Sequence, residues 1–285
     1  MSTRHLPSDY GRKPEAERHQ LRVTFDDVPE LYDRARPLYP EQLFEDLRDL
    51  SGLPKHGRIL EIGPGTGQAT LPLAQAGYEI VGLELGEQLA AFARAKLSPF
   101  KNVAIITTPF ESWDAGDDEK FDAVVAFTAF HWIDPALRFK RPAELLNPNG
   151  SLAVVTTQHV APGGSDQFWS EVQEDYDAVD PSDDSRPPPQ PEDVRDLSRE
   201  IDESGYFKNI ATRRYLWDVT YSADEYIAVL DTYSGHRSLE GSKREDLNER
   251  IRKRIEVRPD ATVTKTYLAT LNVARLIGPT RSESS

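Results

Sequence analysis

One stretch of the sequence decides the predicted fold, Glu61-Ile62-Gly63-Pro64-Gly65-Thr66-Gly67. It closes a short apolar run, residues 59–62, and leads into a helical pattern over residues 68–76 that Gly77 ends. Glycines at a strand-to-helix turn let a ligand approach the backbone and let the helix pack closely on the strand. The stretch therefore predicts a strand, a ligand-binding turn and a helix.

The alternation of strands and helices continues toward the C-terminus. We expect strands at residues 78–85, 103–106, 121–127 and 152–155, and helices at 88–97 and 135–146. The run 121–127 is apolar nearly throughout, as expected of a strand that is covered on both faces. This alternation favours a parallel sheet with right-handed crossovers.

The flanking segments predict further elements around this core. Helical patterns occupy residues 25–35 and 43–50, after a polar start. Residues 158–200 combine two adjacent glycines, many acidic residues and three consecutive prolines, which indicates an insertion, a lid or a linker. Beyond this segment we expect the end of a helix at 201–206, a strand at 213–219, helices at 223–233 and 243–255, and a strand at 262–276.

Composition and charge exclude several classes of protein. The chain has 285 residues, of which 38% are hydrophobic, so it is long enough for one large core or for a core with a smaller cap. It has no cysteine, which excludes disulfides, thiolate nucleophiles and cysteine-ligated metal sites. No apolar run approaches the roughly 20 residues of a membrane span, and residues 1–20 lack the features of a signal or transit peptide. With a formal net charge of −14, the protein is expected to be cytoplasmic and to bind neither nucleic acid nor a membrane surface.

Two carboxylates refine the ligand expected at the glycine turn. The third glycine comes one residue earlier than in the dinucleotide fingerprint G-x-G-x-x-G, whose last glycine would fall at Gln68. Glu84 ends the next predicted strand, where a carboxylate can accept both hydroxyls of a ribose. Glu61 stands just before the glycines, where a negative charge opposes a pyrophosphate and suits a ligand with an ammonium or sulfonium group. The alternatives are a Glu61 carboxylate bonded by N–H groups of the turn and a Glu84 that is merely an exposed strand end.

With these residues, the chain resembles class I S-adenosylmethionine-dependent methyltransferases, and among them the bacterial small-molecule branch (methyltransferase type 11) that includes trans-aconitate methyltransferase-like proteins. Further segments carry the resemblance, namely Phe110-Glu111-Ser112-Trp113, Phe121-Asp122-Ala123-Val124-Val125, Ala129-Phe130-His131-Trp132-Ile133-Asp134, Leu145-Leu146-Asn147-Pro148-Asn149-Gly150, and Tyr32 with Arg36-Pro37-Leu38-Tyr39-Pro40. Asn149 departs from the family's pattern, which has a glycine at this place. The core of the resemblance covers residues 30–157, and residues 226–239 also look like this branch. It implies a Rossmann-like α/β fold with a mostly parallel sheet of about seven strands, helices on both faces and a helical cap.

The resemblance also implies the cofactor, S-adenosylmethionine, its product S-adenosylhomocysteine, and the residues that bind them. The residues expected at the methionine portion of the cofactor are Glu61, Gly63, Gly65, Gly67 and Thr128. Those expected at the ribose and the adenine are Glu84, Leu85, Phe110 and Glu111, and Tyr32 and Tyr39 are expected to close over the cofactor. The implied domains are an N-terminal tail and helical cap segment (1–40), the cofactor-binding core (41–157), and a C-terminal half (158–285) that completes the sheet and carries inserted cap helices.

Methyl transfer depends mainly on a dry, aligned pocket, because the positive charge on sulfur disperses as the acceptor attacks. A base is needed only for an acceptor that is protonated at the working pH, and His131 is the candidate, with a structural or cofactor-orienting role as the alternative. The candidate residues for binding the acceptor are His131, Trp132, His159 and His236. Four arginines also suit an acceptor carboxylate, although a surface ion pair explains each of them more simply, namely Arg34, Arg36, Arg138 and Arg141.

Other methyltransferase classes fit less well. Thr128-Ala129-Phe130-His131 stands where amino-methyltransferases of DNA and protein have Asn-Pro-Pro-Tyr, and the cysteine of cytosine-C5 enzymes is absent. Asp134 lies too late for the magnesium ligand of catechol-type enzymes, and an N-cap before Pro135 explains it, so no metal is expected. We therefore expect a monomeric or homodimeric enzyme that methylates an oxygen or nitrogen of a small-molecule metabolite, whose identity the motifs leave open. The alternatives are an NAD(P)-dependent oxidoreductase and a protein that binds S-adenosylmethionine without turnover.

Overall fold

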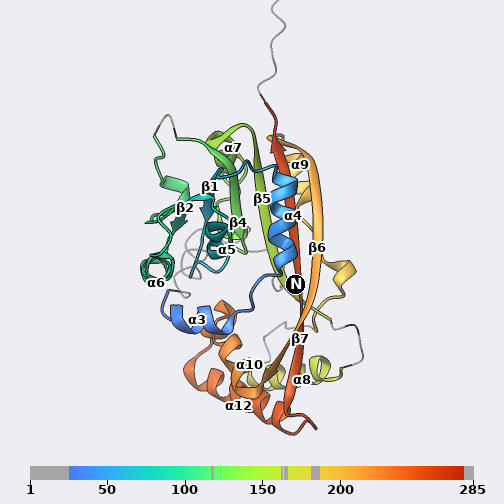
Figure 1. The fold of residues 1–285 in the computed structure, drawn as a ribbon. Helices are drawn as coiled ribbons and strands as arrows, with labels where there is room; N and C mark the ends of the chain where they lie inside the picture. Colours follow the sequence, from blue (N-terminus) through green and yellow to red (C-terminus); the bar gives the residue numbers. More distant parts are fainter. Residues whose placement is uncertain (1–25, 117–118, 162, 164–165, 181–186, 279–285) are drawn as a thin grey trace, which may run out of the picture.

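The computed structural model, which describes residues 26–116, 119–161, 163, 166–180 and 187–278, contains one seven-stranded sheet in the order β3-β2-β1-β4-β5-β7-β6 (Figure 1). The strands are β1 (Arg58–Ile62), β2 (Glu79–Glu84), β3 (Val103–Thr107), β4 (Phe121–Phe127), β5 (Leu146–Val160), β6 (Phe207–Ser222) and β7 (Thr262–Leu276). Strands β1 to β5 pair in parallel, and β7 runs antiparallel to both of its neighbours, β5 and β6. The expected Rossmann-like fold is confirmed.

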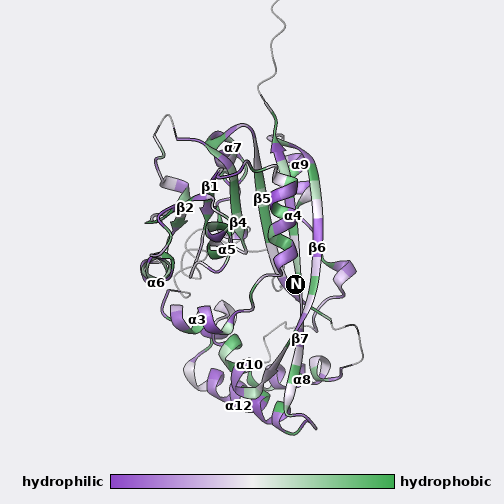
Figure 2. Cartoon of the chain, in the orientation of Figure 1, coloured by the Kyte–Doolittle hydropathy of each residue, from purple (hydrophilic) through white to green (hydrophobic). Residues whose placement is uncertain are grey.

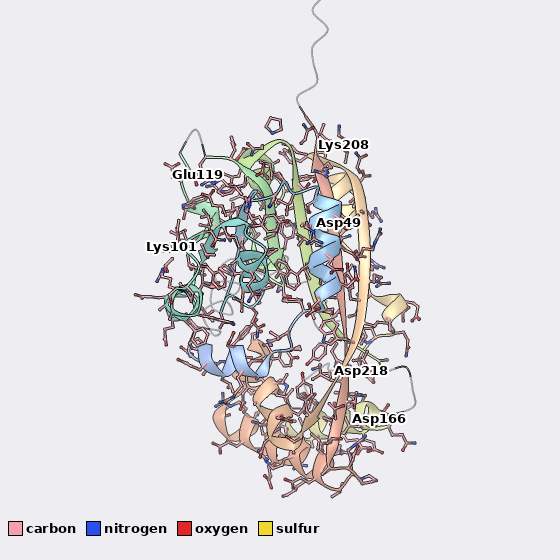
Figure 3. The ribbon with its side chains drawn as sticks, in the orientation of Figure 1. Asp49, Lys101, Glu119, Asp166, Lys208 and Asp218 are labelled. Carbon is pink, nitrogen blue, oxygen red and sulfur yellow. The ribbon has the colours of Figure 1, made fainter. Side chains whose placement is uncertain are left out.

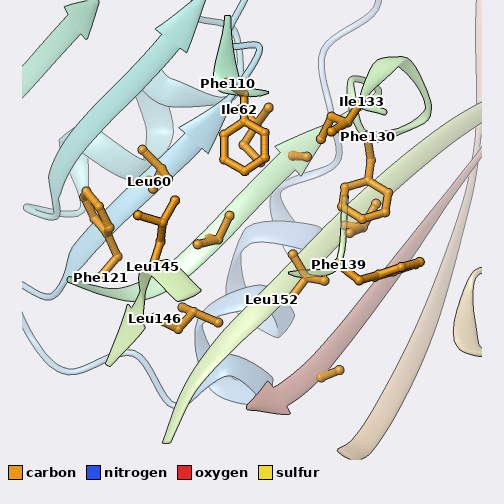
Figure 4. Packing of buried hydrophobic residues seen from close by; sticks show 14 of the residues in the cluster. Leu60, Ile62, Phe110, Phe121, Phe130, Ile133, Phe139, Leu145, Leu146 and Leu152 are labelled. Atoms are coloured by element: carbon orange, nitrogen blue, oxygen red, sulfur yellow. The ribbon is translucent and has the colours of Figure 1, made fainter. Parts of the chain in front are cut away.

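Helices cover both faces of the sheet. They are α3 (Pro29–Ala35), α4 (Glu41–Ser51), α5 (Thr70–Gln75), α6 (Glu87–Leu97), α7 (Lys140–Leu145), α8 (Phe168–Val179), α9 (Ser198–Glu203), α10 (Ala223–Leu230), α11 (Ser234–Arg237) and α12 (Gly241–Glu256). One face packs on α7 and α9 through a core that contains Phe121, Leu145 and Leu152 (Figure 4). The other face packs on α4 and α5 through Leu43 and Leu73. Burial on both faces explains why β4 is hydrophobic along most of its length (Figure 2).

The long strands β6 and β7 extend beyond the parallel strands into a helical cap at the lower end of Figure 1. In the cap, α8, α10 and α12 share an apolar core with the lower part of β7, and α3 contacts α10. Of these cap helices, α8 follows β5, whereas α10 and α12 follow β6. No helix in the part of the chain that the structure describes combines the length and the apolar composition needed to cross a membrane.

Several predicted boundaries were wrong for identifiable reasons. Regular helix occupies only α7 of the predicted 135–146, and Asp134 instead caps a turn, where its Oδ1 accepts a hydrogen bond from the Ala136 N–H at 2.8 Å. Pro142 has no N–H, and it fits α7 because it lies in the first turn, where backbone N–H groups need no helical partner. Residues 147–150 lie within the bounds of β5, and the predicted linker, 158–200, contains the end of β5, the whole of α8 and the start of α9. The start of the helix predicted from residue 25 lies outside the described residues.

Candidate functional site

The glycine turn lies between β1 and α5 at the carboxyl end of the parallel strands, where ligands bind in open α/β sheets. Gly63, Gly65 and Gly67 have φ angles of +65°, +57° and +78°, a left-handed conformation that glycine adopts without strain. A Cβ atom added at Gly63 would lie 2.7 Å from the Cβ of Ala129, whereas one at Gly65 would meet no atom within 4 Å. Gly63 thus allows close packing against the segment after β4, and Gly65 faces space that a ligand can fill.

Glu84 ends β2, and its carboxylate contacts the glycine turn directly. One carboxylate oxygen accepts a hydrogen bond from the N–H of Gly65 at 2.8 Å, and the other accepts one from the N–H of Gly86 at 2.9 Å. A carboxylate accepts up to about four hydrogen bonds, so the same group can fix the turn and receive ligand hydroxyls. The expectation that Glu84 is a mere exposed strand end is therefore wrong, since its side chain is buried.

Glu61 lies on β1 with a fully buried carboxylate. Neither of its oxygens has a hydrogen-bond partner of ordinary geometry among the described residues, so N–H groups of the turn do not satisfy this carboxylate. Burial raises the pKa of Glu61 to about 7, although the nearby Thr70 hydroxyl lowers it, and the charge of Glu84 raises it further. A buried carboxylate whose one nearby donor is the Thr70 hydroxyl is costly, and a cationic ligand would supply the missing charge partner.

Thr128 directly follows β4 and has a φ angle of +54°, which is strained for a β-branched residue. Its hydroxyl lies 3.0 Å from that of Tyr39 and 3.4 Å from that of Thr157. The Tyr39 ring packs edge-on against Phe127, and burial raises the pKa of the Tyr39 hydroxyl. Two residues that the sequence predicts at the cofactor, Tyr39 and Thr128, therefore meet at the end of β4.

The N-terminal segment covers the glycine turn and α6. The side-chain amide of Gln68 donates to the Asp33 carbonyl at 2.9 Å, and Lys96 on α6 pairs with the Asp33 carboxylate at 2.6 Å. Asp26 accepts a hydrogen bond from the Leu89 N–H at 2.8 Å, and so it caps α6, whose own N-cap residue is a glycine. These contacts fix α3, which carries Tyr32, next to the turn.

The residues predicted at the adenine lie after β2 and β3. Leu85 and Glu111 are half-buried. Phe110 is 2% exposed and packs in the core beside Ile62 (Figure 4), while its carbonyl accepts a hydrogen bond from Arg141 at 2.9 Å. Phe110 therefore supports this end of the site from within the core.

His131 and Trp132 form a short 3-10 helix with Phe130 after β4, and their rings lie 4.8 Å apart. Part of the His131 surface is accessible, but protein atoms surround most of the ring, and this desolvation lowers the pKa of His131 to about 3. The imidazole is therefore neutral near pH 7 and is a weak base. A catalytic role of His131 stays a prediction.

The other two predicted acceptor residues lie toward the cap. The ring of His159 on β5 contacts that of Trp169 at 4.2 Å, and His236 lies 2.8 Å from the hydroxyl of Tyr176. A residue that the sequence did not predict in this region is Lys265, which is 3% exposed and donates to the Tyr233 hydroxyl at 3.0 Å. A signal was present, because Lys265 occupies one of the inward positions in the alternating pattern of residues 262–276.

The four arginines considered as partners of an acceptor carboxylate differ in their contacts and in their exposure. Arg138 forms an ion pair with Glu200, and Arg141 donates to backbone carbonyls, so both have structural partners. Arg34 is exposed. Arg36 instead lies over aromatic rings in the cap region, and its Nη2 donates to the Thr232 carbonyl at 2.9 Å.

Comparison with known proteins places this site in a family. Residues 60–154 match the family model described as a methyltransferase domain, a range that includes Glu61, the glycine turn, Glu84 and Thr128. Residues 60–154 therefore form a domain of the class I S-adenosylmethionine-dependent methyltransferase superfamily. The resemblance seen in the sequence is therefore confirmed.

Curated relatives and solved structures agree with this assignment. An uncharacterized methyltransferase of Mycobacterium tuberculosis is 32% identical over 138 residues, 48% of this chain and 54% of the relative. A ubiquinone biosynthesis O-methyltransferase of Azorhizobium caulinodans is 37% identical over 113 residues, 39% of this chain and 42% of the relative. The chain thus spans about half the length of the curated relatives that it matches. The YcgJ protein of Bacillus subtilis has the same fold, with a TM-score of 0.51 at 16% identity over 84% of this chain and 100% of that one.

The residues of the site fit the cofactor that the superfamily implies. S-adenosylmethionine carries ammonium and sulfonium cations and two ribose hydroxyls. Glu61 offers a buried carboxylate without a partner, Gly65 open space beside the backbone, and Glu84 an acceptor at the strand end. No group of three or more histidine, aspartate or glutamate side chains in the described ranges is arranged to hold a metal ion, and metal independence stays a prediction.

Proposed function

We propose that this methyltransferase transfers the methyl group of S-adenosylmethionine to an oxygen or nitrogen atom of a small-molecule metabolite and releases S-adenosylhomocysteine. The observation that carries the proposal is the Glu61 carboxylate, which is buried and lacks a hydrogen-bond partner beside the glycine turn. A pyrophosphate at the same turn would face this carboxylate as a like charge, which disfavours an NAD(P)-dependent reaction.

Each part of the site has a role in this proposal. Glu61 faces the positive charge of the methionine portion, the backbone at Gly65 lies along the cofactor, and Glu84 accepts the ribose hydroxyls. Tyr39 and Thr128 define the end of β4, where the methionine portion is expected. The contacts that fix α3 beside the turn hold Tyr32 at this end of the site.

When bound, S-adenosylmethionine supplies a methyl carbon to which the acceptor atom bonds, while the electron pair of the broken carbon–sulfur bond stays on sulfur. The protein contributes alignment and a dry surrounding, which is the main requirement for such a displacement. Because the pKa of His131 is low, the site suits an acceptor that reaches its reactive form without a strong base.

The partner in this proposal is a small molecule in the cytoplasm. A net charge of −14 disfavours nucleic acid and anionic membrane surfaces as acceptors. The O-methyltransferase named among the relatives acts in ubiquinone biosynthesis, which supports an oxygen acceptor without identifying it. We propose a monomer or a homodimer.

Ligand-dependent stabilisation followed by an activity screen tests the proposal. S-adenosylhomocysteine is expected to raise the unfolding temperature of the protein, and NAD is expected to leave it unchanged. A panel of hydroxylated and amino metabolites is then screened for S-adenosylhomocysteine release. Stabilisation by NAD alone would reverse the proposal, and stabilisation by S-adenosylhomocysteine without any methylated product would indicate a binding protein.

A further inference from the structure

Two cationic side chains share one aromatic ring beneath the cap. The guanidinium carbon of Arg36 lies 4.2 Å from the centre of the Tyr233 ring, and the Lys265 ammonium lies 4.8 Å from the same centre, so the two charges are at most about 9 Å apart. Lys265 also lies within 5.5 Å of the rings of Tyr226 and Tyr267. Within the described ranges, neither cation has a carboxylate partner.

The surroundings of these cations are rich in buried nitrogen atoms without hydrogen-bond partners among the described residues. The Nε of Arg36, the Nε2 of His159 and the Nε1 of Trp169 are buried atoms without a hydrogen-bond partner in the described residues. These residues are contiguous with Lys265, because Trp169 contacts both His159 and Tyr226. We call Arg36, Lys265, Tyr233, His159 and Trp169 the cation cluster.

The charges of the cluster act on its own tyrosine. Burial raises the pKa of Tyr233, but the charges of Lys265 and Arg36 outweigh this effect and lower it to about 8. Burial lowers the pKa of His159 well below its ordinary value, and Lys265 lowers it further, so His159 adds no charge near pH 7. The cluster is thus positively charged inside a protein whose net charge is −14.

The cluster continues directly from the predicted methionine end of the cofactor site. The Thr128 hydroxyl donates to that of Thr157 on β5, and His159 lies two residues further along, on the same face of the strand. His159 pairs with Tyr267 across the sheet, and Lys265 is two residues from Tyr267, so these side chains share one face. A molecule that reaches the cluster therefore lies next to the end of β4.

Resting on the proposed function, we propose that the cation cluster binds a carboxylate group of the methyl acceptor, and that this carboxylate anchors the acceptor and is not itself methylated. Lys265 is buried and Arg36 is half-buried, and cations that have no counter-ion among the described residues are costly to the folded protein. An anion supplies what they lack. A planar carboxylate has two oxygens, which suit the free donors of Arg36 and Lys265.

The anchoring role follows from the charge change in the reaction. Methylation of the bound carboxylate would form an oxygen–carbon bond and leave a neutral ester between two cations, whose contacts would then be lost. Two cations also reduce the electron density that a carboxylate oxygen offers to an electrophile. The bond to the methyl carbon therefore forms at a separate hydroxyl or amino group of the acceptor, which releases its proton to water, and the product keeps its negative charge.

Matched probes test the binding step. Benzoate and benzamide have nearly the same size and differ in charge, and calorimetry measures their affinity with and without S-adenosylhomocysteine. Benzoate is expected to bind at least about 10-fold more tightly than benzamide. Lys265→Met is expected to lose about 10- to 100-fold in benzoate affinity while its affinity for S-adenosylhomocysteine is unchanged. The control, Lys101→Met, alters an exposed lysine (Figure 3) and is expected to leave both affinities unchanged.

The unfolding temperature of ligand-free Lys265→Met distinguishes a binding role of Lys265 from a structural role. If Lys265 mainly stabilised the fold, its substitution would lower this temperature. Because Lys265 is a buried charge without a counter-ion, the ligand-free Lys265→Met protein is expected to unfold at the same temperature as the wild type or at a higher one. Trp169→Phe removes the indole N–H donor together with part of the ring system, and is expected to weaken benzoate binding about 2- to 10-fold while the affinity for S-adenosylhomocysteine is unchanged.

Three results would overturn the inference. They are equal affinity for benzoate and benzamide, unchanged benzoate affinity in Lys265→Met or Trp169→Phe, and tighter binding of inorganic phosphate than of benzoate. A methyl ester as the product of a carboxylic acceptor would contradict the anchoring role. Failure of S-adenosylhomocysteine to bind would instead contradict the proposed function, because benzoate binding is also measured in its absence.

Discussion

Glu61→Gln is the substitution that addresses the cofactor site most directly. The wild-type carboxylate is buried, lacks hydrogen-bond partners among the described residues and has a pKa raised to about 7. A cationic ligand beside it favours the charged form, so its pKa is expected to fall to its ordinary value or below when the cofactor binds. Cofactor binding is therefore expected to release a proton from Glu61.

The number of protons follows from the two pKa values. With a pKa of about 7 in the free protein, Glu61 is about 90% protonated at pH 6 and about 10% protonated at pH 8. If the pKa of the complex is about 4.5 or lower, binding releases about 0.9 proton at pH 6 and about 0.1 proton at pH 8. The affinity for the cofactor is expected to fall by nearly tenfold for each pH unit below 7.

Calorimetry in two buffers with different ionisation enthalpies counts these protons. S-adenosylhomocysteine carries only the ammonium and S-adenosylmethionine carries both cations, so comparison of the two ligands shows which charge Glu61 faces. Glu61→Gln is expected to bind both ligands more weakly, without proton release and without this pH dependence. Proton release below about 0.2 at pH 6 with both ligands in the wild type would refute the reasoning.

The same pKa shift affects the ligand-free protein. Because the pKa of folded Glu61 lies above its ordinary value of 4.5, the folded state binds more protons than the unfolded state between these pH values. The free energy of unfolding therefore decreases as pH rises from about 4.5 to 7, by up to about 3 kcal/mol. Urea unfolding at pH 8 is expected to show that Glu61→Gln is the more stable protein, although it binds the cofactor less well.

Three further predictions concern neighbouring parts of the site. Glu84→Ala is expected to weaken S-adenosylhomocysteine binding by about 1–3 kcal/mol, since hydrogen bonds to a charged group are lost, and an unchanged Kd by calorimetry would contradict this role. Gly63→Ala places a Cβ atom 2.7 Å from that of Ala129 at a φ of +65° and is expected to lower the free energy of unfolding by about 1–3 kcal/mol, whereas Gly235→Ala, with open space at its Cβ, serves as the neutral control. His131 has a pKa of about 3, so the rate constant kcat is expected to show no titration of this residue between pH 5 and 8, and an inflection that disappears in His131→Asn would show otherwise.

Local sequence patterns predicted most strands of the sheet. The strand bounds that were wrong depend on pairing between segments that lie far apart in the sequence. The alternation over residues 262–276 predicted the bounds of β7 correctly, because β7 is paired with β6 from its first residue to its last. The predicted strand 152–155 was too short, since β5 also pairs with β7 as far as Val160, and that partner lies more than 100 residues later in the chain. The helix at 135–146 was overestimated because Pro142 fits only the first turn of a helix.

Within the site, the residues that could be predicted are those that lie close to the glycine turn in the sequence. Glu61 stands within two residues of the glycine turn, and Glu84 at the end of the next strand, so spacing alone placed both beside the same ligand. Arg36 and Lys265 are far apart in the sequence and meet only because α3 packs on α10 while β7 runs beside β5. That neither has a carboxylate partner among the described residues is a property of the folded chain, and sequence spacing does not predict it.

The central claim is that the glycine turn, Glu61 and Glu84 bind S-adenosylmethionine through its positive charge and its ribose. A crystal structure with S-adenosylhomocysteine tests it most directly. The account predicts the ligand's ammonium within hydrogen-bond distance of the Glu61 carboxylate and its ribose hydroxyls on Glu84. A ligand bound elsewhere in the protein, or bound at the turn with its carboxylate against Glu61, would contradict the account.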